Sequence, residues 1–164
     1  MFREMRRKTQ QLTDAESIAI LEKSSSGVLA LLGDEQYPYA LPISYVYRDG
    51  KLYFHCAMAG HKLDAIAGSD KASFCVIDRD QVVPEEYTTY YRSVIAFGRI
   101  RMLEDTAAKR AAIECLAEKY APAQAGADQE INQSWSRLCM LEMRIEHMTG
   151  KEAIELRRMS GGSQ

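Results

Sequence analysis

Apolar and polar residues alternate along much of the central chain, with the period of two that half-buried β-strands show. Segment 40–47 alternates in this way. Pro42 lies within it and cannot donate a hydrogen bond to a neighbouring strand, so the segment is expected at a sheet edge or a bulge. Asp49-Gly50 follows as a hairpin signal. Further strands are expected at 28–32, 52–56, 72–77, 94–103 and 138–147.

Three segments carry helix signals. Thr13 and Glu16 have the spacing of a capping box, which predicts a helix that ends at the Ser24–Gly27 cluster. A short helix is expected over 61–67 and a longer one over 107–120. Segment 123–128 is expected to be a loop, and 157–164 a frayed polar tail.

These elements favour one fold class. About six strands joined by hairpins, with about three helices, predict a mostly β protein, an antiparallel barrel or sandwich with flanking helices. Along the last strand, Cys139, Leu141, Met143 and Ile145 are expected to point inward, and Glu142, Arg144 and Glu146 outward. The chain carries neither a G-x-G-x-x-G nor a Walker sequence. We divide it into a basic N-terminal arm (1–12), a main domain (13–151) and a polar C-terminal tail (152–164).

Composition narrows the function classes. The 164 residues suffice for one domain, and 46% of them are hydrophobic. A net charge of -2 argues against charge-driven nucleic-acid binding. The longest aliphatic run, 28–32, is too short to span a membrane, and residues 1–11 do not resemble a signal peptide. The four cysteines show no C-x-x-C spacing, so we expect reduced thiols in a cytoplasmic protein.

The densest cluster of chemical groups is segment 55–64. A strand ends there, small residues turn, and a helix begins with His61-Lys62, a setting that suits a phosphate. The alternative is a solvated polar turn. The same cluster offers His55, Cys56, His61 and Asp64 as metal ligands, but neighbours on a strand point to opposite faces, so His55 and Cys56 cannot easily share one ion and no metal is expected.

A second cluster precedes the strand at 94–103. Tyr87, Tyr90 and Tyr91 lie close to Arg92 and Ser93. Tyrosine and arginine are enriched at subunit interfaces and can stack on planar ligands. Ordinary packing at a strand start is the alternative, and the spacing does not choose between them.

The order of these blocks resembles a known family, the pyridoxamine 5'-phosphate oxidase-like flavoproteins, and within it the branch of 5-nitroimidazole resistance (nitroreductase-like) proteins. The resemblance covers roughly residues 13–151. It is carried by the blocks Pro38-Tyr39, Leu41–Tyr47, Asp49–Cys56, Gly60–Asp64, Ser73–Val76, Ser93–Gly98 and Ile145–Lys151.

The resemblance implies a split β-barrel that binds FMN at the interface of a homodimer. The strand matching Pro42, Ile43, Ser44 and Tyr45 would lie along the isoalloxazine ring. The phosphate would be held by residues matching His55, Cys56, Ala57, His61 and Lys62. Arg92 and Ser93 would come from the partner subunit. The turn is His-Lys where many vitamin B6 oxidases have Arg-Lys, so the resemblance implies FMN binding without implying vitamin B6 oxidation.

The resemblance also leads to an expected function. The resemblance favours an FMN-dependent oxidoreductase that acts on a small planar electron acceptor, with His61 matching a histidine near the flavin in that branch. No catalytic residue is identified. One alternative is a non-enzymatic flavin or haem carrier on the same barrel, with His55, His61 or His147 as axial ligands. Another is a structural dimer without a ligand.

Overall fold

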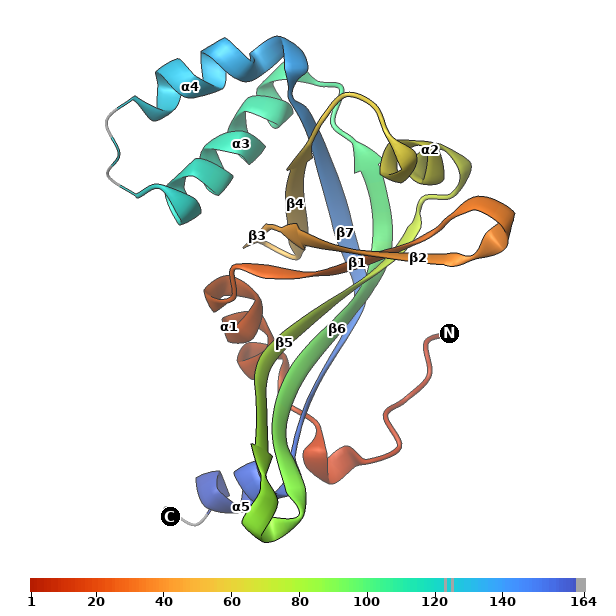
Figure 1. Ribbon diagram of the computed structural model, residues 1–164, viewed down its shortest axis with the longest axis vertical. Helices are drawn as coiled ribbons and strands as arrows, with labels where there is room; N and C mark the ends of the chain where they lie inside the picture. Colours follow the sequence, from red (N-terminus) through yellow and green to blue (C-terminus); the bar gives the residue numbers. More distant parts are fainter. Residues whose placement is uncertain (123, 125, 162–164) are drawn as a thin grey trace.

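The computed structural model describes residues 1–122, 124 and 126–161 (Figure 1). Seven strands form one sheet of antiparallel pairs in the order β2-β1-β5-β6-β7-β4-β3. The strands are β1 Ser26–Leu32, β2 Pro38–Ser44, β3 Val46–Arg48, β4 Lys51–Cys56, β5 Lys71–Val83, β6 Thr88–Met102 and β7 Cys139–Glu152. The helices are α1 Asp14–Lys23, α2 His61–Gly68, α3 Thr106–Tyr120, α4 Ala127–Ser134 and α5 Ile154–Gly161. The mostly β class with flanking helices is confirmed.

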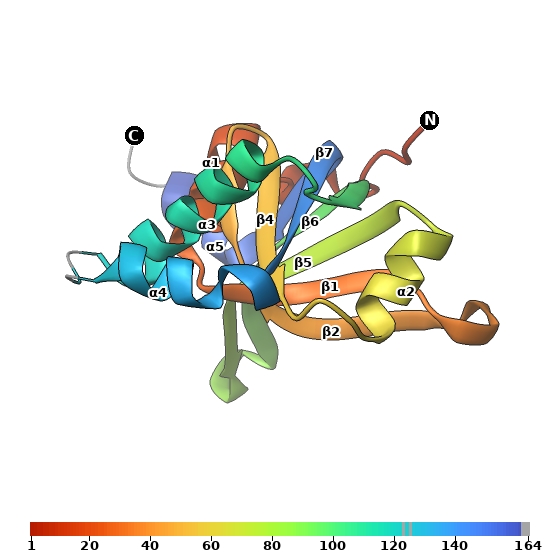
Figure 2. The ribbon, with the colours of Figure 1, turned by 90° about the horizontal axis from the view of Figure 1, so that it is seen from above.

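The sheet closes on itself at Tyr45. β2 and β3 lie at opposite edges of the sheet, yet only Tyr45 separates them in the sequence, so the edges must meet there. The single strand expected over 40–47 is therefore wrong, because the chain turns a corner inside it. The expectation that Pro42 lies on an edge strand is confirmed, and so is the Asp49-Gly50 hairpin between β3 and β4. Figure 2 shows the resulting barrel from above.

A tyrosine of α3 stabilises this corner. The Tyr120 hydroxyl accepts from the Tyr45 N–H at 2.9 Å and lies 2.7 Å from the Tyr45 carbonyl. It also contacts the Ser25 carbonyl, so its single proton serves either oxygen. The Tyr45 side chain is fully buried and donates to the Leu21 carbonyl at 2.8 Å. The backbone groups that lose their ladder partners at the corner are thus satisfied by α3.

Two main cores hold the barrel and its helical cover together. Inside the barrel, Leu29, Phe54 and Phe74 are fully buried, and the two phenylalanine rings meet edge to face at 5.3 Å. The second core lies between the sheet and α3, where Leu116 packs with Met140. The helix expected over 107–120 is confirmed, and α4 packs beside it (Figure 2).

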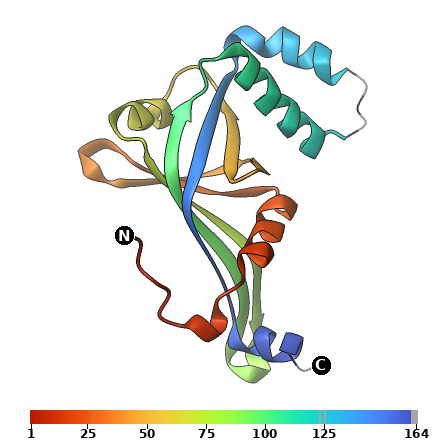
Figure 3. The ribbon, with the colours of Figure 1, turned by 180° about the vertical axis from the view of Figure 1, so that it is seen from behind.

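Strands β5, β6 and β7 continue well beyond the barrel as a long extension. Helix α1 lies against one side of it, and the N-terminal segment passes on the other (Figures 1 and 3). The strands expected at 72–77, 94–103 and 138–147 were thus too short. Residues of the extension, such as Asp80, Gln81 and Thr89, are polar and show no apolar alternation, but β5 and β6 pair regularly there, with Asp80 opposite Tyr91 and Gln81 opposite Tyr90. Ladder hydrogen bonds, and not an apolar pattern, extend these strands.

Two further expectations are corrected. The loop expected over 123–128 gives way to α4 at Ala127, while residues 123 and 125 lie outside the described part of the chain. Of the tail expected to fray over 157–164, residues 157–161 belong to α5 instead, where Leu156 is buried, and residues 162–164 lie outside the described part of the chain. Arg157 pairs with Glu16 of α1 at 3.0 Å and with Glu152 of β7 at 3.2 Å. These pairs attach α5 to the body of the protein.

Glu142 of β7 was expected to point to solvent, but it is buried on the outer side of the barrel. Lys51 donates to it at 2.9 Å, and Arg101 donates through two nitrogens at 2.9 and 3.0 Å. Burial opposes ionisation of the carboxyl, but these cations outweigh it and hold the pKa of Glu142 below its usual range. Long cationic side chains from neighbouring strands thus cover a carboxylate that the alternation alone would expose.

We expect Glu142→Gln to lower the free energy of unfolding at pH 7 by about 2 kcal/mol, because two cations lose their charged acceptor. A carboxyl with a depressed folded-state pKa stabilises the fold above its unfolded pKa and loses that contribution as pH falls through the folded one. The difference between variant and wild type should therefore shrink below about pH 4. Urea unfolding at pH 7 and pH 3 measures both. Glu118→Gln removes an exposed pair with Arg48 and should change stability by less than about 0.5 kcal/mol. Equal effects of the two substitutions would contradict the role given to Glu142.

Candidate functional site

The turn that joins β4 to α2 has the features expected of an anion site. Gly60 caps the helix with a φ of +132°, which glycine adopts without strain. Among the described residues, no side chain caps this helix, so its first N–H groups remain available to a ligand. The ring of His61 stacks on that of Tyr39 from β2, with centroids 4.1 Å apart. This stacking fixes the turn against the β1–β2 hairpin.

Lys62 supplies the positive charge of the turn. Its side chain is half-buried and forms no ion pair within the part of the chain that the structure describes, whereas the neighbouring His61 Nε2 lies 3.6 Å from the Asp34 carboxylate. Cys56 ends β4 directly opposite Cys139 of β7. Burial first, and then the Cys139 thiol, raise the pKa of Cys56 to about 12, although Lys62 acts in the opposite direction. Cys56 is therefore a neutral core thiol, whereas Lys62 and the exposed Ala57 remain accessible to a ligand.

Pro42, Ile43, Ser44 and Tyr45, which were predicted to contact the isoalloxazine ring, are consecutive in the sequence. Their side chains nevertheless point to two different sides of the chain. Pro42 and Ser44 expose their side chains on the outer side of β2. Ile43 packs against the barrel core, and Tyr45 is fully buried. A ligand lying along β2 would therefore touch the side chains of Pro42 and Ser44. It would meet only the main chain of Ile43 and Tyr45.

Ser44 and His55 both line a cavity of about 660 Å³, which we name the α3–α4 chamber. The opposite wall is apolar and comes from the two helices. It includes Ile113, Leu116, Ala117 and Ile131. Ser44 and His55 were predicted as site residues from the sequence, but the helical wall was not. The apolar stripe of α3 was a usable signal for it, but α4 was not expected.

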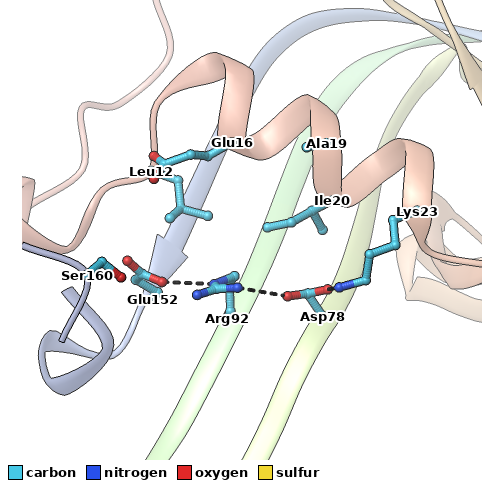
Figure 4. A pocket seen from close by; sticks show the side chains of 9 residues that line it. All are labelled: Leu12, Glu16, Ala19, Ile20, Lys23, Asp78, Arg92, Glu152 and Ser160. Atoms are coloured by element: carbon cyan, nitrogen blue, oxygen red, sulfur yellow. Dashed lines mark hydrogen bonds and ion pairs between the residues drawn. The ribbon is translucent and has the colours of Figure 1, made fainter. Parts of the chain in front are cut away.

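Arg92 lies far from this site within one chain. It sits in the extension beneath α1, at a pocket of about 270 Å³ (Figure 4). Its Nε donates to Glu152 at 2.8 Å, and its Nη1 lies 3.4 Å from Asp78, which also pairs with Lys23 at 2.7 Å. The charge of Arg92 is thus balanced by two buried carboxylates. The structure does not bring it together with His61 in one subunit.

Ser93 points to the other side of β6, together with Ile95 and Phe97. We call this side the outer face. Ile95 is 40% exposed and Phe97 38% exposed. The register continues the row through Val28 of β1 and Cys75 of β5. Apolar residues near the middle of a sheet are ordinarily covered, whereas Ile95 and Phe97 are covered only in part within the single chain.

The remaining singled-out residues do not form one patch. Tyr90 is buried against α5, Tyr87 is 98% exposed at the hairpin, and Tyr91 lies on the outer face with the Lys151 ammonium 5.1 Å from its ring centroid. His147 stacks on Phe2 of the N-terminal arm at 4.7 Å. Within residues 1–122, 124 and 126–161, no three metal-ligating side chains gather as an ion site. Tyr90 and Tyr91 therefore both pack at the α5 cluster, whereas Tyr87 lies apart from them.

Comparison with known proteins identifies the family of this chain. The sequence model of the family described as "Pyridoxamine 5'-phosphate oxidase" matches residues 13–152. The protein belongs to this family. Among curated proteins, none matches the sequence.

Several solved structures share the fold. A conserved hypothetical protein from Mycobacterium tuberculosis has a TM-score of 0.80 at 17% identity, covering 96% of this chain and 93% of its own. A protein provisionally named a 5-nitroimidazole antibiotic resistance protein, from Bacteroides thetaiotaomicron, has a TM-score of 0.75 at 18% identity, covering 87% and 86%. A FAD and heme binding protein from Mycobacterium smegmatis has a TM-score of 0.72 at 22% identity, covering 93% and 80%. The expected split β-barrel is confirmed. In the described residues, no helix is long and apolar enough to cross a membrane.

Proposed function

We propose that this protein is an FMN-binding oxidoreductase. The observation that carries the proposal is the path that leads from the start of α2, along the exposed side of β2, to the α3–α4 chamber. A phosphate fits the free N–H groups of α2 beside Lys62, where a helix start and a lysine both favour a dianion. The ring would lie over Pro42 and Ser44.

The length of this path supports the assignment. Tyr39, on which His61 stacks, is five residues from Ser44 along β2. At the rise of an extended strand, this is about 17 Å. An extended FMN has comparable length from its phosphate to the far edge of its ring. A phosphate at Lys62 would therefore place that ring edge at Ser44 and His55, by the chamber.

We propose further that a second copy of the chain covers the outer face. An obligate dimer interface buries about 2,000 Å² or more, and on the outer face Ile95 and Phe97 stay partly exposed although the Phe2 ring of the N-terminal arm lies 5.7 Å from that of Phe97. Ser93 belongs to this face and can reach a partner's site. Arg92 points away from the face, so its contribution would require the ion pairs with Glu152 and Asp78 to rearrange.

When bound, the flavin would supply electron transfer to a small planar acceptor. The chain would bind the phosphate through α2, orient the ring on β2 and exclude water with α3 and α4. Its four cysteines are free thiols, which supports a cytoplasmic location.

Anaerobic reduction tests the enzymatic part of the proposal. NADH or NADPH should bleach the bound flavin, and an uncharged planar acceptor should restore its colour with many turnovers per protein. Flavin binding without turnover by either donor would favour the non-enzymatic flavin carrier. A Soret band in place of flavin absorption would favour a haem carrier and would contradict the proposal.

A further inference from the structure

The α3–α4 chamber is larger than the edge of one flavin ring requires. Its volume of about 660 Å³ falls in the range of small-molecule sites. Tyr120 secures α3 to the corner at Tyr45, so the helical wall is held firmly against the sheet. The chamber is thus a formed cavity with room for a second molecule beside Ser44 and His55.

The formal charge on the described part of the chamber wall is negative. Among the described residues that line it, Glu130 of α4 is the single one with a formal charge. Glu130 is exposed and accepts from the Ser134 hydroxyl at 3.2 Å. No lysine or arginine lines the described wall. An anionic ligand would therefore lose hydration beside a carboxylate without gaining a cation.

The charge preference of the chamber is opposite to that of the α2 turn, where Lys62 and free N–H groups favour an anion. The two ends of the path along β2 thus select different chemistry. The polar groups left at the chamber are a serine hydroxyl, a histidine ring and a side-chain amide, which suit neutral hydrogen-bonding groups.

We propose that the α3–α4 chamber is a separate binding subsite for an uncharged aromatic molecule of one or two rings, and that Glu130 discriminates against carboxylated or phosphorylated ones. Its role as the site of the electron acceptor rests on the proposed function. Its preference for uncharged ligands rests on the wall alone.

Two matched fluorescent probes that cannot be reduced by a flavin test the subsite, 2-naphthalenemethanol and 2-naphthoate. Fluorescence titrations of the FMN-loaded protein and of the protein without flavin are run at pH 8, above the ordinary range of histidine protonation. The alcohol should bind at least ~10-fold more tightly than the carboxylate, a difference of about 1.4 kcal/mol. Glu130→Gln should strengthen naphthoate binding several-fold and leave the alcohol unchanged.

A pair of substitutions on α3 locates the ligand. Ala117 lines the chamber, whereas Ala111 is exposed elsewhere on the same helix. Ala117→Phe should weaken binding of the alcohol by more than ~10-fold, and Ala111→Phe should not. Thermal unfolding of both variants shows whether they are folded. If Ala117→Phe unfolds the protein, the effect of Glu130→Gln on naphthoate binding decides whether the ligand lies in the chamber.

Equal affinity for the two probes, or alcohol binding that Ala117→Phe leaves intact in a folded protein, would overturn the subsite. Both results are independent of FMN binding, which is measured on the same samples. Binding of the alcohol without binding of FMN would support the subsite and contradict the proposed function. Binding of FMN without binding of the alcohol would contradict the subsite alone.

Discussion

Replacing Lys62 with alanine is expected to weaken FMN binding by ~10–150-fold. A charge-assisted hydrogen bond to a phosphate contributes roughly 1.5–3 kcal/mol, and each 1.4 kcal/mol is a factor of ten in affinity. Lys62 is half-buried at the α2 turn and is not engaged by a carboxylate among the described residues, so its ammonium group is available. Quenching of flavin fluorescence measures the dissociation constant directly.

Riboflavin provides the internal control for this substitution, because it lacks the phosphate. It should bind equally to wild type and to Lys62→Ala. Lys71 is an exposed lysine at the start of β5, and Lys71→Ala should leave the FMN dissociation constant unchanged. If Lys62→Ala behaves like Lys71→Ala, Lys62 is a solvated surface residue and the phosphate lies elsewhere.

Ile95→Arg is expected to separate the dimer and, with it, to abolish retention of FMN. Ile95 lies in the centre of the outer face, and a partner would bury the introduced guanidinium without a counter-charge. We expect the dimer dissociation constant to rise by more than ~100-fold. Sedimentation equilibrium should give wild type about twice the chain mass of 18.5 kDa and the variant the mass of one chain.

Met159→Arg is the matched control, since Met159 is 60% exposed on α5 and lies away from the outer face. It should remain a dimer with unchanged FMN binding. A wild-type protein that sediments as a monomer at micromolar concentration, or a dimeric Ile95→Arg, would show that this face is not the interface.

The barrel was largely predictable because its elements carry local signals. The capping box of Thr13 and Glu16 is present, with the Thr13 N–H donating to Glu16 at 2.6 Å. Pro42 marked its edge strand, and Asp49-Gly50 marked its hairpin. Each of these depends on one residue's own backbone or side-chain chemistry, which the sequence shows directly.

The extension and the C-terminal helix were missed because their stability comes from distant partners. Glu152 reads as a polar tail residue, but Arg92 and Arg157 neutralise it from β6 and α5. Helix α4 contributes few apolar residues, and Ile131 alone is buried among its described side chains. Contacts with distant strands and helices determine the structure of these segments. No short window of sequence contains both partners of such a contact.

The candidate site was predicted in part for the same reason. His61 and Lys62 were identifiable from a strand, a turn and a helix start that follow one another along the chain. The placement of Ser44 and His55 at one cavity depends on the corner at Tyr45, which a tyrosine 75 residues away completes. The chamber therefore emerges only from the tertiary fold.

A flavin titration of the purified protein, followed by gel filtration, shows whether the protein holds FMN through the phosphate. We expect saturation at one FMN per chain, a yellow protein that keeps its FMN through the column, and riboflavin bound at least ~10-fold more weakly because the α2 turn has no phosphate to hold. A protein that emerges colourless after incubation with excess FMN, or that binds riboflavin as tightly as FMN, would contradict this expectation.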